Sequence, residues 1–232
     1  MSIDNKFGRN PDIDPGSVPE DIWDGGGVYT GFPSAAETLS VVSTDAADTA
    51  AGTGARQVRV IGLDSNWNRA SETITLNGLT PATGTTQFIR INTAAVVSVG
   101  SGGSNVGSIT ISHSTTTANV FNVIQPGTNQ GMSSAYSVAA GQTAYLVKQT
   151  YTMRGATSAN ADMCLYSRVF GGPFRQRRTL AVFYGILITD SIVGGLPFGE
   201  KSDLVLRCLR MSTNNIEIAA GFDILLIKNL NG

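Results

Sequence analysis

The sequence is poor in the residues from which most active sites are built. Its 232 residues include one histidine and two cysteines, and charged residues make up 14% of the chain, against about 25% in an average soluble domain. One histidine and two isolated cysteines match no zinc-ligand spacing, and the cysteines are too few for a disulfide framework. We therefore expect no enzyme, no metal site and no cofactor.

Long apolar runs and net charge are also missing. No apolar stretch reaches the ~18 residues of a membrane-spanning helix, and with a formal net charge of −1 no overall field attracts nucleic acid or a membrane. The N-terminal segment has neither the basic nor the apolar region of a secretory signal. We expect folding in a reducing cytosol, with Cys164 and Cys208 reduced and buried in their apolar runs.

The motifs that come nearest to chemistry are incomplete. His113 lies on the apolar face of a predicted strand, and no nucleophile motif accompanies it, so we expect it to make a structural hydrogen bond. In "GGLPFGEKS", Gly194 and Gly199 have the P-loop interval, but Glu200 stands where that motif requires lysine. We interpret this stretch as a loop.

The first 33 residues differ from the rest, because they are rich in proline, glycine and acidic residues. Prolines recur at four-residue intervals, at Pro11, Pro15 and Pro19. This spacing excludes a helix, and the segment has too little apolar surface for a core. We predict an extended N-terminal arm over residues 1–33, the alternative being a disordered tail.

Three large apolar side chains near the end of this arm favour the first alternative. They are Trp23, Tyr29 and Phe32, which flank three consecutive glycines. Aromatic residues are enriched at protein interfaces, and a purely solvated tail seldom carries them. We expect these three residues to anchor the arm on a partner.

From Ser34 onward, apolar and polar residues alternate with the period of a β-strand. In "TITLN" Ile74 and Leu76 share one face, and in "SITISH" Ile109 and Ile111 do. Two further strands are predicted with inward residues Tyr145, Val147, Tyr151 and Met153, and with Phe222, Ile224 and Leu226. The apolar stretch "TLAVFYGILIT", residues 179–189, is predicted to be a central strand.

Turn residues separate these strands at short intervals, as at Asn77-Gly78 and Gly194-Gly195. No long helical pattern intervenes, which indicates an antiparallel β-sandwich of the jelly-roll kind. We prefer a single body over residues 34–232. The segment Gln125-Pro126-Gly127 is the best candidate boundary if the body consists of two domains.

The later half of the chain carries a basic run, "RQRR", at residues 175–178. Its basic residues are Arg175, Arg177 and Arg178. The N-terminal arm, residues 1–33, which we also call the leader, contains six acidic and two basic residues. An acidic arm and a basic body attract each other, so we predict an intersubunit salt-bridge patch. A solvated strand face is the second interpretation, and nucleic-acid contact is the third, because the net charge does not suit a dedicated binder.

Several stretches together resemble a known family. They are "IWDGGGVYTGFP", "VVSTDAADTAAGTGARQVRVIGLDSNWNRASETITLNGLTP", "TAYLVKQTYTMRGA", "EKSDLVLRC" and "AAGFDILLIKN". The combined pattern resembles virion structural proteins of tailed, mostly aquatic, bacteriophages. The resemblance implies a non-enzymatic protein that is made in the host cytoplasm and assembled into the virion, on the capsid as decoration or on the tail.

The expected partners follow from this resemblance and from the arm. They are further copies of the chain, with a trimer as the favoured oligomer, and other capsid or tail proteins; neither nucleic acid nor a membrane is expected. The rival hypothesis is a receptor-binding module of a tail fibre or baseplate that binds glycan. Trp67, in "DSNWNR", is its one candidate sugar platform, although a packed loop anchor is the commoner role for such a residue.

Overall fold

The computed structural model describes residues 1–229, and it builds them from β-strands and turns. Every pairing between the strands of this described part is antiparallel. The predicted all-β sandwich class is confirmed. Within residues 1–229 no helix is long and apolar enough to cross a membrane.

The chain forms two compact units rather than one body. Unit 1 comprises Met1–Tyr29 and Ser133–Gly232, and unit 2 comprises Thr30–Met132. The predicted division into an arm, 1–33, and a single body, 34–232, is therefore wrong. The preferred single body fails because each unit buries its own apolar cluster, so each is a domain with its own core.

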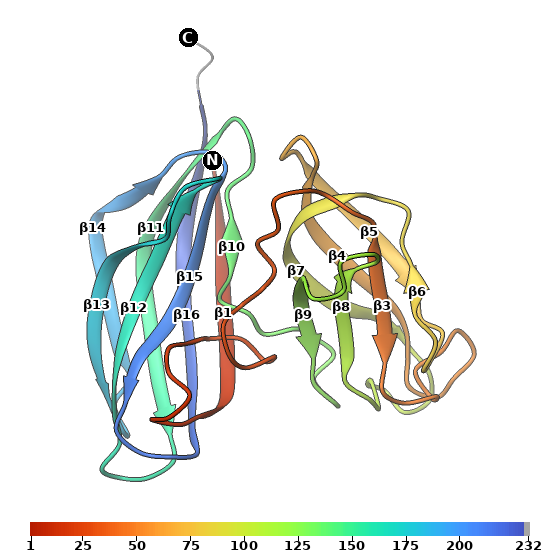
Figure 1. Ribbon diagram of the computed structural model, residues 1–232, viewed down its shortest axis with the longest axis horizontal. Coiled ribbons are helices and arrows are strands. Elements are labelled where there is room, and N and C mark those ends of the chain that lie inside the picture. Colours follow the sequence, from red (N-terminus) through yellow and green to blue (C-terminus); the bar gives the residue numbers. More distant parts are fainter. Residues whose placement is uncertain (230–232) are drawn as a thin grey trace. The chain divides into compact units, whose positions relative to one another are not determined.

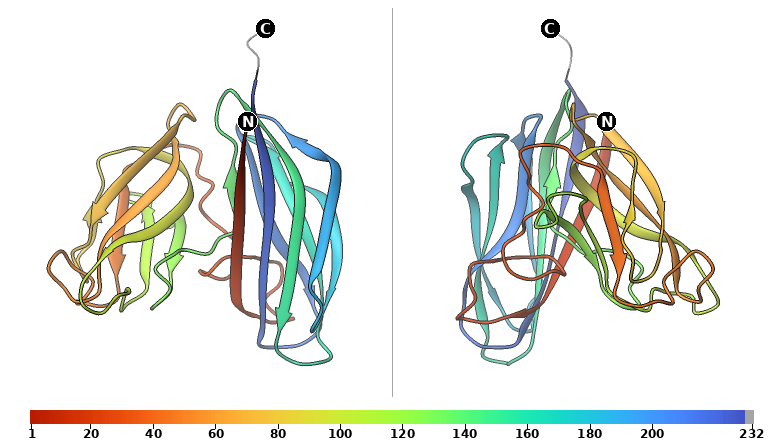
Figure 2. Two further views of the ribbon diagram at one scale, coloured as in Figure 1. Left: turned by 180° about the vertical axis from the view of Figure 1, so that it is seen from behind. Right: turned by 45° about the vertical axis from the view of Figure 1, so that its right-hand side comes forward.

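Unit 1 is a sandwich of two sheets (Figures 1 and 2). One sheet has the order β1-β16-β11-β14, formed by Ser2–Ile13, Ile216–Lys228, Gln142–Arg154 and Ile188–Phe198. The other has the order β10-β15-β12-β13, formed by Tyr136–Ser137, Ser202–Met211, Asn160–Val169 and Arg175–Phe183, and β2 (Glu20–Asp21) also pairs with β15. Both sheets contribute to one core, which includes Leu146, Tyr151, Leu165, Leu206 and Phe222.

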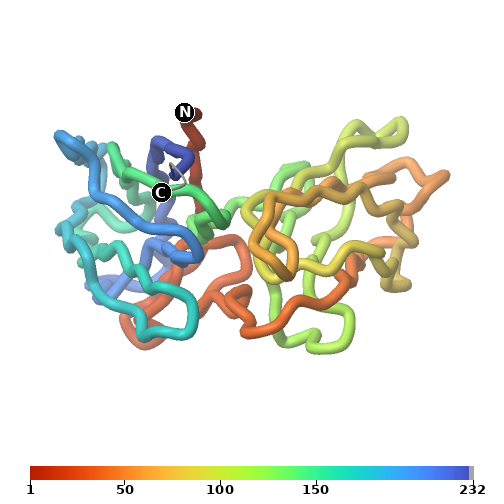
Figure 3. The backbone as a smooth tube through the Cα atoms, turned by 90° about the horizontal axis from the view of Figure 1, so that it is seen from above, coloured from red at the N-terminus to blue at the C-terminus, as the bar shows by residue number. Residues whose placement is uncertain are grey.

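The leader belongs to this core, so it is no free arm. From Ser2↔Leu226 to Ile13↔Ile216, β1 pairs with β16, and in Figure 3 the red N-terminal segment runs beside the blue last strand. Pro11 lies at a register break of this edge strand, a position that tolerates a residue without an N–H. The segment cannot fold on itself, but strands from the far end of the chain supply the apolar surface that it lacks.

Unit 2 is a smaller sandwich built from a contiguous segment (Figure 1). Its sheets have the orders β6-β3-β8-β9 and β5-β4-β7. Their strands are β3 Leu39–Ser43, β4 Ala55–Asp64, β5 Arg69–Thr75, β6 Ala82–Thr83, β7 Phe88–Val99, β8 Ile109–His113 and β9 Val120–Ile124. The predicted inward residues Ile74, Leu76, Ile109 and Ile111 all lie in its core.

Unit 2 is inserted into unit 1 between β2 and β10. Both of these short strands pair with β15, in the registers Asp21↔Arg207 and Tyr136↔Leu204. A β-bridge joins Trp23 to Ser133 where the chain leaves unit 1 and returns to it. The departure and return points are therefore neighbours, as the ends of an inserted domain require.

Residues 179–189 do not form the predicted central strand. They contain the end of β13, a turn and the start of β14, and each strand is the edge of its sheet. Val182 is buried, but Phe183, Tyr184, Ile186 and Leu187 are exposed. The apolar density of this stretch indicated burial, whereas the turn at Gly185, with φ of 73°, divides it between two sheets.

Candidate functional site

A cleft of about 290 Å³ lies at one end of unit 1. Its lining comes from the end of β12, the turn after it, the start of β13, the end of β14 and the start of β15. The lining residues are Ser167, Arg168, Val169, Gly172, Pro173, Arg175, Arg177, Pro197, Phe198, Gly199 and Ser202. Arginines are the only ionisable residues among them, so the cleft has the composition of an anion-binding site and lacks a general acid or base.

Local turn chemistry shapes one wall of the cleft. After β12 the chain turns through Gly171, whose φ is 78°, and the Gly172 N–H donates to the Val169 carbonyl at 2.9 Å. The Phe170 N–H donates to the Lys201 carbonyl, also at 2.9 Å. These bonds fix the turn against the segment between β14 and β15.

Arg168 is held by a buried ion pair. It stands opposite Asp203 in the β12–β15 ladder, and its Nε donates to Asp203 Oδ2 at 3.0 Å. Asp203 is fully buried and also accepts a hydrogen bond from Ser137 Oγ at 2.6 Å. The Arg168 guanidinium lies over the Phe174 ring, 4.5 Å from its centroid. This arginine is therefore neutralised and fixed in position.

Arg175 and Arg177 enter the same cleft from β13. A register shift between Leu165↔Arg178 and Tyr166↔Gln176 leaves Arg177 without a residue opposite on β12, which is how a bulge re-aims a side chain. The Arg177 guanidinium lies 5.7 Å from the Phe198 ring centroid. Neither Arg175 nor Arg177 has an ion pair with any residue of the described chain.

Arg178 is separated from these two arginines. Its Nη2 donates to Asp190 Oδ1 at 2.7 Å, and this hydrogen bond raises the pKa of the guanidinium above its ordinary value. The bond joins edge strand β13 of one sheet to edge strand β14 of the other. The structure thus brings two of the three predicted arginines into the cleft and gives the third a structural partner.

Exposed apolar side chains gather along β13, β14 and the turn between them. They are Phe183, Tyr184, Ile186, Leu187 and Val193, with exposed fractions of 49%, 38%, 53%, 65% and 100%; we call them the edge patch. Val193 lies in an irregular stretch, since β14 has four residues between the pairs Leu146–Leu196 and Lys148–Ser191 where β11 has one. Exposed apolar side chains at the edges of sheets make the edge patch a candidate contact site.

Two of the three aromatic residues predicted to anchor the leader are buried. Trp23 and Tyr29 are each 5% exposed, and their rings pack edge to face with centroids 5.2 Å apart. Phe32 belongs to unit 2, where the Arg90 guanidinium lies 5.5 Å from its ring centroid. Trp23 and Tyr29 are therefore buried within the chain and do not anchor an exposed arm on a partner. The anchoring role of Phe32, which is half-buried, stays a prediction.

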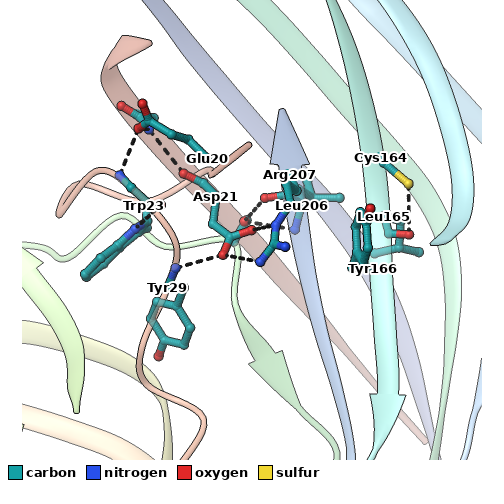
Figure 4. A network of polar contacts seen from close by, with 12 residues as sticks. Glu20, Asp21, Trp23, Tyr29, Cys164, Leu165, Tyr166, Leu206 and Arg207 are labelled. Carbon is teal, nitrogen blue, oxygen red and sulfur yellow. Dashed lines mark hydrogen bonds and ion pairs between the residues drawn. The ribbon is translucent and has the colours of Figure 1, made fainter. Parts of the chain in front are cut away.

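The leader acids pair within their own chain (Figure 4). Asp21 accepts hydrogen bonds from Arg207 Nε and Nη2 at 2.6 and 2.9 Å and from the Tyr29 N–H at 2.8 Å. Glu20 accepts from the Gly27 N–H at 2.8 Å, and Arg9 pairs with Asp24 at 2.9 Å. Of these contacts, the Asp21–Arg207 pair alone joins the leader to the later half of the chain, and it lies within one chain and outside residues 175–178. The intersubunit salt-bridge patch stays a prediction.

The remaining candidate residues have structural roles. Trp67 is 4% exposed and lies under the Arg90 guanidinium at 4.9 Å, so the prediction of a sugar platform there is wrong. His113 is fully buried and its Nε2 lies 2.9 Å from the Phe88 carbonyl, which confirms the structural role. Cys164 and Cys208 are buried and unpaired, as predicted. Burial raises the pKa of the Cys208 thiol to about 12, which makes it unreactive.

Sequence reasoning missed the partners that complete the cleft. Arg168 and Asp203 meet only because β12 and β15 are neighbours, and no local motif encodes that pairing. Phe198 and Pro197 belong to the glycine-rich stretch interpreted as a loop. The nearest signal in the sequence is the basic run "RQRR" itself, with Phe174 directly before it. Among residues 1–229 no cluster of three or more potential metal ligands exists.

No protein-family model, curated protein or solved structure matches the chain.

Proposed function

We propose that this chain is a non-enzymatic structural component of a tailed-phage virion, a β-sandwich subunit that forms a symmetric oligomer on the capsid or the tail. The observation that carries the assembly role is the edge patch. Five large apolar side chains lie exposed on two edge strands of one unit and on the turn that joins them. Such a patch on an otherwise charge-poor surface favours a protein partner.

The resemblance to virion structural proteins supplies the particle, and the strand order agrees with it. When the strands of unit 1 are counted along the chain, with β2 and β10 sharing the second place, the two sheets read 1-8-3-6 and 2-7-4-5. We interpret this alternation as a jelly roll, an architecture common in viral capsid proteins. The N-terminal arm has no part in this proposal, because the leader is a strand of its own unit.

A second copy is the partner that suits the edge patch best. The sheet that contains β14 has β1 as its opposite edge, and β1 also exposes apolar side chains, with Ile3 at 69% and Phe7 at 42%. Two different edges that associate head to tail generate a closed ring when the rotation permits closure. A ring of three subunits remains our expectation for the oligomer.

The test is the assembly state of the full-length protein and its variants. We expect sedimentation velocity to show an oligomer for the wild type, and a monomer for the variant Ile186→Asp/Leu187→Asp. The matched control is Leu79→Asp, because Leu79 is 63% exposed on unit 2; it keeps the oligomer. Antibody labelling of intact virions then locates the protein on the particle. A wild-type monomer that is absent from purified virions overturns the proposal.

A glycan-binding role in a tail fibre or baseplate is the second candidate function. Trp67 no longer favours it, since that ring is buried. The arginine-lined cleft does favour it, because it offers a ligand a concave surface with unpaired charge.

A further inference from the structure

We infer that the cleft between β12, β13, β14 and β15 binds an acidic sugar, a ring that carries one carboxylate, sulfate or phosphate. The charge of the cleft is the first feature that favours this ligand. Arg168 is neutralised by Asp203, whereas Arg175 and Arg177 have no acidic partner in the described chain. The cleft therefore holds an excess of two positive charges in a protein whose net charge is −1. Guanidinium groups bind planar oxyanions through paired N–H donors.

The second step is preorganisation. Arg168 is fixed between Asp203 and the Phe174 ring, and Arg177 lies against the Phe198 ring. Contacts of this kind hold long side chains in position before a ligand arrives. The entropy lost on binding is then smaller, and more of the interaction energy appears as affinity.

The third step is size and lining. A volume of about 290 Å³ lies at the small end of ligand pockets, so it accommodates one ring and its acidic group rather than a length of polymer. Pro173 and Pro197 provide apolar walls for the C–H face of a ring. Ser167 and Ser202 line the cleft as hydroxyl donors and acceptors for sugar hydroxyls.

This inference is independent of the assembly role. The cleft lies where β13 begins and β14 ends, whereas most of the edge patch surrounds the turn that joins the two strands. Failure of the edge-patch variants to change the oligomer therefore leaves the cleft untouched. Conversely, loss of sugar binding leaves the assembly proposal standing.

The experiment is calorimetric titration of the full-length protein with defined probes at low salt. The probes are glucuronate, glucose 6-sulfate and glucose 6-phosphate, with glucose as the neutral control. We expect at least one acidic probe to bind ten or more times more tightly than glucose, because hydrogen bonds to charged groups are the strongest that the cleft can make. Equal affinity for glucose, or no binding by any acidic probe, overturns the inference.

Two variants and a matched control locate the binding. Arg175→Gln and Arg177→Gln should each weaken the acidic probe by about tenfold or more. The control Arg210→Gln removes the same charge from an exposed position on β15 outside the cleft, and it should keep the wild-type affinity. An equal loss in the control shows diffuse attraction only, and overturns the site.

A last experiment distinguishes two ligands of the cleft: a free acidic sugar and a carboxylate of a neighbouring copy of the chain. If Arg175→Gln/Arg177→Gln dissociates the oligomer while no acidic probe binds the wild type, the cleft receives a protein carboxylate. That result contradicts the sugar assignment. Circular dichroism of each variant confirms that its strands are intact, so that a loss of binding reports on the cleft and not on unfolding.

Discussion

Units 1 and 2 are both β-sandwiches, but they bury charge in different ways. Unit 1 uses ion pairs between residues far apart in sequence, such as Asp21 with Arg207. Unit 2 uses a buried carboxylate, Asp48, which accepts hydrogen bonds from Ser43 Oγ and from the N–H groups of Ala55, Val106 and Gly107. In unit 2, which is contiguous in sequence, the buried carboxylate connects neighbouring turns. In unit 1, which is formed from both ends of the chain, the ion pair connects residues from the two ends.

The two units also differ in what they expose. Unit 1 carries both the edge patch and the arginine-lined cleft. The large apolar residues that unit 2 exposes, Ile61, Leu79, Val97 and Val106, are dispersed in sequence, as on any protein surface. Both candidate sites therefore lie on the unit that is assembled from the two ends of the chain. Each unit contains one tryptophan, Trp23 or Trp67, so fluorescence in Trp67→Phe and Trp23→Phe backgrounds follows them separately.

The largest expected effect comes from removing β1. Deletion of residues 1–13 takes an edge strand and the buried Ile13 from unit 1, so we expect unit 1 to lose its cooperative unfolding transition. Unit 2 contains none of these residues and should keep its midpoint in urea within error. Trp23 and Trp67 emission, each measured alone, checks both statements. A normal transition for Trp23 after the deletion contradicts the assignment of the leader to the core.

Breaking the Asp21–Arg207 pair should be the next largest effect. Asp21→Asn removes one charge from a buried ion pair, which typically costs about 3–5 kcal/mol. We expect this loss in unit 1 and no change in unit 2. Urea unfolding followed through Trp23 measures it.

The control for this prediction is Arg210→Gln. Its ion pair with Asp162 spans 3.5 Å and the arginine side chain is 83% exposed, so the expected change is below about 1 kcal/mol. If both substitutions cost the same, the buried pair has no special role.

Unit 2 should respond most to the loss of Asp48. Burial acts to raise the pKa of this carboxyl, but the four hydrogen bonds outweigh burial and lower it. A lowered pKa gives stability that is present above the unfolded value, near 3.9, and is lost as pH falls through the folded one. Asp48→Asn should destabilise unit 2 by about 2–3 kcal/mol at pH 7 and flatten its loss of stability below pH 4. Unfolding followed through Trp67 between pH 2 and pH 7 checks both; an unchanged acid profile rules out Asp48 as the source.

The smallest effect concerns Lys6, a buried cation in unit 1. Burial lowers its pKa from 10.5 to about 8, although nearby Asp4 acts in the opposite direction. Between these values the unfolded chain binds the proton and the folded chain does not, so this group adds stability as pH rises. Lys6→Met should stabilise unit 1 at pH 7 by a fraction of the ~3 kcal/mol to which this pKa shift corresponds, and the gain should shrink between pH 8 and pH 10.5.

Between pH 8 and pH 10.5 the free energy of unfolding of the wild type must be compared with that of Lys6→Met. Burial raises the pKa of Cys208 to about 12, so the unfolded thiol releases its proton first and wild-type stability falls at high pH for a separate reason. The difference between the two curves isolates Lys6. A difference that stays constant from pH 7 to pH 10.5 contradicts the assignment.

Local alternation predicted burial well wherever a strand is regular. Phe222, Ile224 and Leu226 of β16 are 1%, 0% and 2% exposed, as expected. In β11 the register shifts between Leu146 and Lys148, so Leu146 is buried while Tyr145 and Val147 of the predicted face are only half-buried. A bulge reverses the facing of every residue on one side of it, and the sequence carries no local signal of its position.

Long-range pairing explains the other errors. Nothing within residues 1–33 reveals that β16 pairs with the first strand, so the segment resembled an arm. The same limit applies to the cleft, because Arg175 and Arg177 are visible as a basic run while Arg168, Asp203 and Phe198 join them only in the folded sheets. Alternation and turn spacing predicted the class of fold, but contacts between distant strands decided the domains and the site.

The adjacency of β2 and β10 on β15 has an architectural consequence. The chain leaves unit 1 for unit 2 after β2, which pairs with β15 at Arg207, and it returns through β10, which pairs with β15 at Leu204. Exchange of unit 2 therefore requires no change in the strand order of unit 1. Surface sites with closely spaced ends tolerate domain insertion and circular permutation. This junction is therefore a natural grafting position, at which a peptide tag, an enzyme or an unrelated sandwich can replace residues 30–132 while the host keeps its strand pairing. The chain has the layout of a display scaffold with an interchangeable cassette.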